Sequence, residues 1–255
     1  MKLIKSVFAV FTVCALLALP AQAHFLEIVG TPPAAEKGKP YALTLAFGHP
    51  NKGTLLKMDA PTKVEVITPS GTQDLTKEVA KGKEDNTMNV SFTPDADGDY
   101  VIVVEGAPYY EKDENQFIAQ TAKMIAHVGA EEGDWNKPVG LPVEIVPLSR
   151  PYALLEGSSF TGQVLVDGKP APNTKVEVTL AKCCDPIVLP STLHDTQTIF
   201  TDANGVFTVA MLLSGWWGFA AITEPGKTMK SPDGKDVPVE TDGVLWVYTD
   251  LMKMK

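Results

Sequence analysis

The stretch that decides the fold reads Ser159-Phe-Thr-Gly-Gln-Val-Leu-Val166, then Asp167-Gly168, then Thr174-Lys-Val-Glu-Val-Thr-Leu180. Apolar and polar residues alternate in both runs, which is the pattern of a strand with one buried face. The Asp-Gly pair is typical of a tight turn, because both residue types tolerate a left-handed backbone. The stretch therefore predicts β-strands joined by short turns.

The same alternation recurs on both sides of this stretch, with turn residues between the runs. The expected strands cover residues 41–47, 63–67, 88–92, 100–105, 196–200, 206–209, 216–222 and 244–248. No long amphipathic helix is indicated. Many short strands at even spacing predict an all-β protein with two tandem β-sandwich domains of immunoglobulin or transthyretin type.

The boundary between the two expected domains is marked by prolines. Pro142, Pro147 and Pro151 lie close together after a segment without a strand pattern, and they indicate a stiff connection. We therefore expect an N-terminal domain over residues 24–147 and a C-terminal domain over residues 148–255.

The first 23 residues have the pattern of a cleavable signal peptide. Lys2 and Lys5 precede an apolar run from Val7 to Leu19, and Ala21-Gln-Ala23 forms a small-residue cleavage site. The run is too short for a membrane anchor, and no later segment reaches the roughly 18 apolar residues of a spanning helix. The pattern predicts export to the periplasm, cleavage before His24 and no membrane span in the processed protein.

Cleavage at this site makes His24 the first residue, which gives it unusual chemistry. Its free α-amine and its imidazole can chelate one metal ion near neutral pH. His49, in Phe47-Gly-His-Pro50, stands where an expected strand ends, and two adjacent strands can bring His24 and His49 to one rim. An amine and two imidazoles suit nickel, cobalt, copper or zinc, and copper binds such a set most tightly. The alternative is that both histidines are incidental.

Three further residues of the expected N-terminal domain are weighed as ligands. The Met58 thioether is a weak ligand that favours cuprous copper, although methionine in an apolar stretch more often fills space. Glu105 is a candidate ligand or an acceptor that orients a coordinating imidazole, and a solvated Glu105 is equally consistent with the sequence. His127 follows an alternating run and is expected to be a strand residue, with metal ligation as the minor alternative.

Cys183 and Cys184 are the two cysteines that follow the signal peptide. Adjacent cysteines can form a strained disulfide or bind a soft metal, and two buried or loop cysteines without a role are at least as consistent with the sequence. His194 lies ten residues after Cys184, but this spacing matches no closed zinc pattern.

Charge and motifs exclude several classes of function. The net charge of −9 disfavours nucleic acid and anionic membrane surfaces as partners and is compatible with cations. No serine–histidine–acid arrangement, phosphate loop or paired-carboxylate motif stands out, so we expect a protein that is not an enzyme.

Many short motifs together resemble the periplasmic components associated with cobalt and nickel ABC-type uptake systems of the energy-coupling-factor kind. The motifs are Ala23-His24-Phe25, Phe47-Gly-His-Pro50, Met58 before Ala60-Pro61, Gly98-Asp-Tyr100 leading to Glu105, Ala107-Pro-Tyr109, Glu132-Gly-Asp-Trp135, Pro138-Val-Gly-Leu-Pro142, Glu144-Ile-Val-Pro-Leu148, Arg150-Pro-Tyr152, Asp167-Gly-Lys-Pro170, Thr201-Asp-Ala-Asn-Gly-Val-Phe207 and Gly215-Trp-Trp-Gly-Phe-Ala-Ala221. The resemblance extends through nearly the whole processed chain, and its specificity lies in the combination.

This resemblance implies an exported protein that captures nickel or cobalt and passes the ion to a membrane transporter. His24 and His49 are the positions that the resemblance carries over as ligands. The loop from Lys182 to His194 departs from the family pattern. Two alternatives stay open: a copper-binding histidine-brace protein, acting as a carrier or an oxidase, and a structural sandwich module without a metal.

Overall fold

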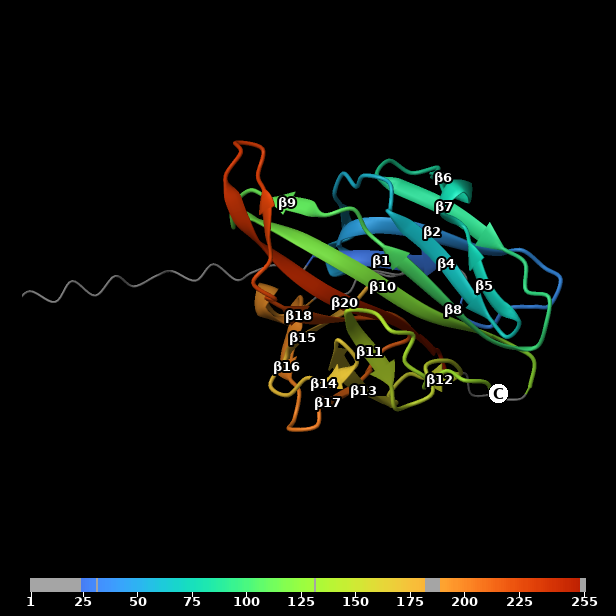
Figure 1. Cartoon of the computed structure of the whole chain (residues 1–255). Helices are drawn as coiled ribbons and strands as arrows, with labels where there is room; N and C mark the ends of the chain where they lie inside the picture. Colours follow the sequence, from blue (N-terminus) through green and yellow to red (C-terminus); the bar gives the residue numbers. More distant parts are fainter. Residues whose placement is uncertain (1–23, 31, 131, 182–188, 253–255) are drawn as a thin grey trace, which may run out of the picture.

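The computed structural model describes residues 24–30, 32–130, 132–181 and 189–252. The signal-peptide prediction, Cys183 and Cys184 lie outside these residues. Within the described part, strands form three layers (Figure 1), and the only helices are three short 3-10 turns.

The strands and 3-10 turns have the following bounds: β1 Phe25–Gly30, β2 Tyr41–His49, η1 Pro50–Lys52, β3 Thr54–Leu55, β4 Lys63–Thr68, β5 Gly71–Asp74, η2 Thr76–Glu78, β6 Ala80–Lys81, β7 Thr87–Phe92, β8 Gly98–Glu105, β9 Tyr109–Glu111, β10 Gln116–Val128, β11 Val143–Pro147, β12 Leu154–Leu155, β13 Ser159–Val166, β14 Lys169–Pro170, β15 Lys175–Leu180, η3 Thr192–His194, β16 Gln197–Phe200, β17 Val206–Ala210, β18 Gly215–Thr223, β19 Thr228–Lys230 and β20 Asp236–Asp250.

A long central sheet separates two smaller sheets. Its main path runs β16-β15-β18-β20-β10-β8-β4-β5, with β9, β12 and β19 attached at the sides. The five-stranded sheet of β1, β2, β3, β6 and β7 covers one part of this sheet, and the four-stranded sheet of β11, β13, β14 and β17 covers another (Figure 1). The all-β sandwich architecture is thus confirmed.

Strand β8 is almost continuously apolar because both of its faces are buried. Ile102 and Val104 face the core shared with the five-stranded sheet, whereas Val101 and Val103 face the core shared with the four-stranded sheet. A strand that is buried on both faces needs apolar side chains at consecutive positions. The run from Tyr100 to Val104 meets this requirement.

The predicted turn at Asp167-Gly168 is confirmed, with φ angles of 49° and 73° at the two residues. The sequence predicts a stiff connection around Pro147, but the structure has a strand there. Val143–Pro147 is the fully buried strand β11, paired with β13. A proline is tolerated at the end of β11 because this strand lies at the edge of its sheet.

The two halves of the chain share the central sheet. Strand β10 pairs in parallel with β20 from Phe117 opposite Val239 to Met124 opposite Trp246. Strands of the expected N-terminal and C-terminal domains therefore lie side by side in one sheet, and the N-terminal residues approach β20.

Glu27 is a buried carboxyl group in β1 that makes stability depend on pH. It is 6% exposed, its Oε1 has no hydrogen-bond partner in the described part of the chain, and burial raises its pKa from 4.5 to about 7. A raised folded-state pKa stabilises the fold below pH 4.5, and this contribution is lost as the pH rises through 7.

We therefore expect Glu27→Gln to remove this pH dependence. Relative to the variant, the parent should lose up to about 3 kcal/mol of unfolding free energy between pH 4.5 and 7.5, because one pKa unit corresponds to about 1.4 kcal/mol. Urea denaturation at both pH values measures the difference. The exposed Glu84 provides the control Glu84→Gln, and parallel pH profiles of parent and Glu27→Gln would contradict the prediction.

Candidate metal centre

Strands β1 and β2 bring His24 and His49 to one rim, as the sequence predicts. The two strands are antiparallel, with Phe25 opposite Gly48, so His24 precedes β1 at the end where His49 closes β2. Residues that alternate along two paired strands share a face. His24 and His49 therefore lie next to each other although 25 positions separate them in sequence.

Gly48 explains why a glycine precedes His49. A Cβ atom at position 48 would lie 2.1 Å from the carbonyl oxygen of Thr54, closer than any real contact. The missing side chain lets β3 fold back onto the end of β2, where His49 pairs with Thr54. The tight return after Pro50–Lys52 holds His49 on a rigid strand end.

The two imidazole rings are in direct contact. Their centroids are 4.5 Å apart, with planes inclined by 42°. Metal–nitrogen bonds to histidine are about 2.0–2.1 Å long, and the contact places the two rings side by side at one end of the strand pair. Phe47 stacks on His24 at 5.6 Å, and Tyr109 lies 5.7 Å from the same ring.

Glu111 is a residue beside His24 that the sequence reasoning missed. Its Oε2 lies 3.3 Å from Nε2 of His24, and both side chains are largely buried. Tyr109 and Glu111 are alternate residues of β9, so the strand presents both to His24. The alternation in Tyr109-Tyr-Glu111 is the signal that could have identified it.

Electrostatics keeps His24 neutral. Burial of the ring, followed by the nearby His49, lowers the pKa of His24 to about 4, although the Glu111 carboxylate acts in the opposite direction. A neutral imidazole at pH 7 keeps a nitrogen lone pair for a metal ion. The imidazole of His24 can thus bind a cation without first losing a proton.

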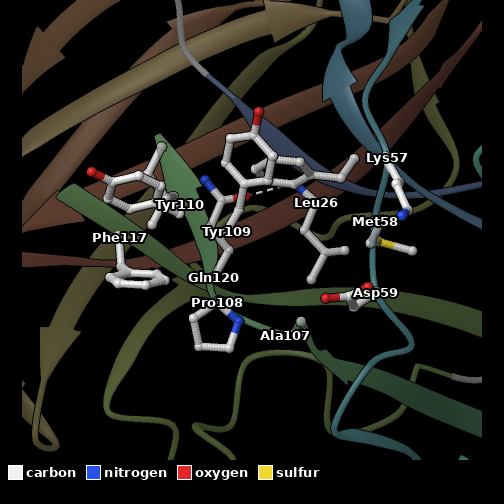
Figure 2. A pocket seen from close by; sticks show the side chains of 13 residues that line it. Leu26, Lys57, Met58, Asp59, Ala107, Pro108, Tyr109, Tyr110, Phe117 and Gln120 are labelled. Carbon is white, nitrogen blue, oxygen red and sulfur yellow. Dashed lines mark hydrogen bonds between the residues drawn. The ribbon is translucent and has the colours of Figure 1, made fainter. Parts of the chain in front are cut away.

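A cavity of about 420 Å³ lies beside the histidine pair and shares Phe47 and Tyr109 with it. Figure 2 shows the labelled residues around this cavity: Leu26, Lys57, Met58, Asp59, Ala107, Pro108, Tyr109, Tyr110, Phe117 and Gln120. Met58 is half-buried and packs against the core, as a space-filling methionine would. The structure therefore places Met58 next to the site, in the wall of the cavity.

Glu105 ends β8, one residue before the stretch that lines the cavity. Its carbonyl oxygen accepts hydrogen bonds from the backbone N–H of Thr62 at 2.9 Å and from the Thr62 hydroxyl at 3.2 Å. In the structure it is Glu111, and not Glu105, that contacts His24.

His127 is a residue of β10, which confirms the strand prediction. Its Nδ1 lies 2.7 Å from Oδ1 of Asp99, and its ring stacks on Tyr152 at 4.3 Å. His194 lies in the 3-10 turn η3, with Nδ1 3.0 Å from the Ser191 hydroxyl. These contacts involve neither His24 nor His49, although Asp195 beside His194 pairs with Lys52, three residues after His49, at 3.2 Å.

In the part of the chain that the structure describes, no group of three or more His, Cys, Asp or Glu side chains is arranged to hold a metal ion. The α-amine of a processed His24 is not a side chain and stands outside this count. Among the same residues, no helix has both the length and the apolar character needed to cross a membrane.

Comparison with known proteins gives one family and several distant structures. No curated protein matches the sequence. Among solved structures, the native conformation of E. coli alpha-2-macroglobulin is 14% identical with a TM-score of 0.25, and the similarity covers 89% of this chain and 14% of the macroglobulin chain. A segment of two fibronectin type-III domains from chicken tenascin is 12% identical with a TM-score of 0.24, covering 88% of this chain and 98% of the tenascin segment.

The family match extends over most of the sequence. The model of a domain of unknown function, DUF4198, matches residues 21–225, which include β1, β2, β9 and β10 and hence the whole candidate metal centre. The chain belongs to the DUF4198 family.

Proposed function

We propose that this protein is exported to the periplasm, binds nickel or cobalt there and passes the ion to a membrane uptake transporter. The observation that carries the proposal is the contact between the His24 and His49 rings at 4.5 Å. The signal-peptide pattern of residues 1–23 supports export, and the resemblance to uptake components supports the transporter as partner. The role is capture and transfer, without catalysis.

The proposed ligands are the amine and one ring nitrogen of His24 and the imidazole of His49. The amine and Nδ1 of one histidine close a six-membered ring with a metal ion. The other ring nitrogen, Nε2, lies against Glu111, which suits the usual arrangement in which a coordinating imidazole donates its free N–H to a carboxylate. Glu111 would then orient the His24 ring.

Copper is the competing ion for the same three nitrogens. The amine and two imidazoles form a histidine brace, and divalent copper has the highest intrinsic affinity for nitrogen ligands. The neighbouring Met58 is a soft group that favours cuprous copper. Metal selectivity separates the copper carrier from the nickel or cobalt carrier.

Calorimetric titration of the metal-free processed protein with nickel, cobalt, copper and zinc tests the proposal. We expect one ion to bind per chain, and His49→Ala to weaken nickel binding by more than about 10-fold, because even the loss of a group that only orients a ligand costs about 10- to 100-fold. The control is His194→Ala, since His194 is exposed and its ring contacts Ser191.

Each result has a distinct meaning. Tight nickel or cobalt binding that requires His49 supports the uptake role, whereas copper binding with negligible nickel affinity supports the brace alternative. Unchanged binding in His49→Ala places the site elsewhere. A parent protein that binds none of the four ions contradicts the proposal and leaves a sandwich module with incidental histidines.

A further inference from the structure

Side chains hold strand β1 along the edge where no neighbouring strand pairs with it. It lies at the edge of the five-stranded sheet, so its backbone pairs with β2 on one side alone. On the other side the N–H of Leu26 donates to Oε1 of Gln120 at 2.6 Å, and Nε2 of Gln120 donates to the carbonyl oxygen of His24 at 2.7 Å. One amide side chain thus binds the backbone on both sides of Phe25.

A second side chain continues this pattern. The indole N–H of Trp246 donates to the carbonyl oxygen of Leu26 at 2.8 Å, across 220 positions of sequence. Trp246 is 1% exposed and Gln120 is 5% exposed. These buried hydrogen bonds occupy the backbone groups that a neighbouring strand would otherwise pair with.

Gln120 is itself fixed by the C-terminal half of the chain. Its Nε2 also donates to Oδ2 of Asp242 at 3.0 Å, and Gln120 and Asp242 are register partners in the parallel pairing of β10 with β20. Asp242 is 2% exposed. The orientation of the Gln120 amide is thus set by a residue of β20.

We propose that Gln120, Asp242 and Trp246 are positioning residues that fix the backbone of residues 24–26, so that the amine and imidazole of His24 bind the same ion as His49. The inference rests on the proposed function. It assigns a role to the C-terminal half: strand β20 supplies two of the three groups that hold the N-terminal ligand.

The physical reason is the freedom of a chain end. A terminal residue normally frays, and a metal ion would have to order it on binding. The His24 carbonyl and the Leu26 N–H are already held by hydrogen bonds. The metal ion then has fewer backbone torsions to order, chiefly the one that sets the direction of the His24 amine. Groups that orient metal ligands in this way typically change affinity by about 10- to 100-fold.

A coupling experiment separates positioning from general stability. Nickel affinity is measured by calorimetry for the parent and for Gln120→Leu, each with a free His24 terminus and with one alanine added before His24. With the free terminus we expect Gln120→Leu to weaken binding about 10- to 100-fold. With the added alanine, where the amine is no longer a ligand and only the imidazole of His24 remains to be positioned, the same substitution should weaken binding by a clearly smaller factor.

Further variants keep the test independent of one substitution. Trp246→Phe keeps an aromatic ring and removes the indole N–H, so it should show the same dependence on the terminus. Asp242→Leu removes the acceptor of Gln120 Nε2 and should show this dependence as well. Gln163→Leu is the matched control, because the side chain of Gln163 also donates to a backbone carbonyl, that of Asn204, but at an exposed position. The melting temperatures of the Gln163→Leu and Gln120→Leu proteins are compared.

The outcomes distinguish this inference from the proposed function. The inference is overturned if Gln120→Leu and Trp246→Phe each weaken nickel binding equally with the free His24 terminus and with the added alanine. The role of these residues would then be general stability. The inference is also overturned if neither substitution weakens binding at the free terminus while the parent binds nickel. A parent that binds no metal overturns the proposed function and this inference together.

Discussion

One alanine added before His24 is expected to weaken nickel binding by more than about 100-fold, beyond the loss caused by changing a group that only orients a ligand. The added residue converts the amine into a peptide nitrogen, whose lone pair is delocalised and which must lose its proton before it can bind the ion. The chelate ring at His24 is lost, and its imidazole and His49 are left as separate ligands. Titration calorimetry of the two proteins measures the change.

The control for this prediction is one alanine added after Lys255, which adds the same residue and leaves the amine free. Both extended proteins should unfold at the same temperature as the parent in the absence of metal, because the hydrogen bonds of residues 24–26 to Gln120 and Trp246 do not involve the amine. If the protein extended before His24 binds nickel as tightly as the parent, the amine is not a ligand.

Replacing Glu144 with leucine is expected to destabilise the fold by about 3–5 kcal/mol, the usual cost of leaving a buried charge without its partner. Nζ of Lys123 lies 2.6 Å from Oε1 of Glu144, and the two side chains are 2% and 1% exposed. The Glu144 carboxylate also accepts the backbone N–H groups of Val139, Gly140 and Leu141. Burial already lowers the pKa of Lys123, even with Glu144 in place.

Urea denaturation of three variants tests this prediction. The double variant Lys123→Met with Glu144→Leu should recover part of the loss, because it no longer buries an unpaired charge but still leaves the three N–H groups without their acceptor. Lys230→Met is the control, since the ion pair of Lys230 with Asp236 is exposed and should contribute less than about 1 kcal/mol. A Glu144→Leu protein within about 1 kcal/mol of the parent would show that Lys123 finds another partner or loses its proton at little cost.

Local patterns in the sequence predict most strands and, in the candidate site, the pair of His24 and His49. The run Ser159–Val166 is a strand with the predicted bounds, because alternation of apolar residues directly reports a buried face. The proximity of His24 and His49 follows from two strands that begin and end at one rim. These features depend on residues near one another along the chain or on neighbouring strands.

Other features depend on partners that no local pattern reveals. The parallel pairing of Gln120 with Asp242 joins residues 122 positions apart, and periodicity identifies strands without naming their neighbours. Glu111 escaped notice because β9 has three residues, too few for a clear alternation. Glu144 sits among prolines in a segment that reads as a connection, yet it is buried in β11.

The parallel pairing of β10 with β20 also has a consequence for the order of events during folding. Contacts between distant parts of a chain form slowly, and proteins rich in them fold in milliseconds to seconds. Because Asp242 and Trp246 belong to β20, residues 24–26 cannot reach their final environment until β20 has paired with β10. The segment that carries His24 is synthesised first and is among the last parts of the molecule to be completed.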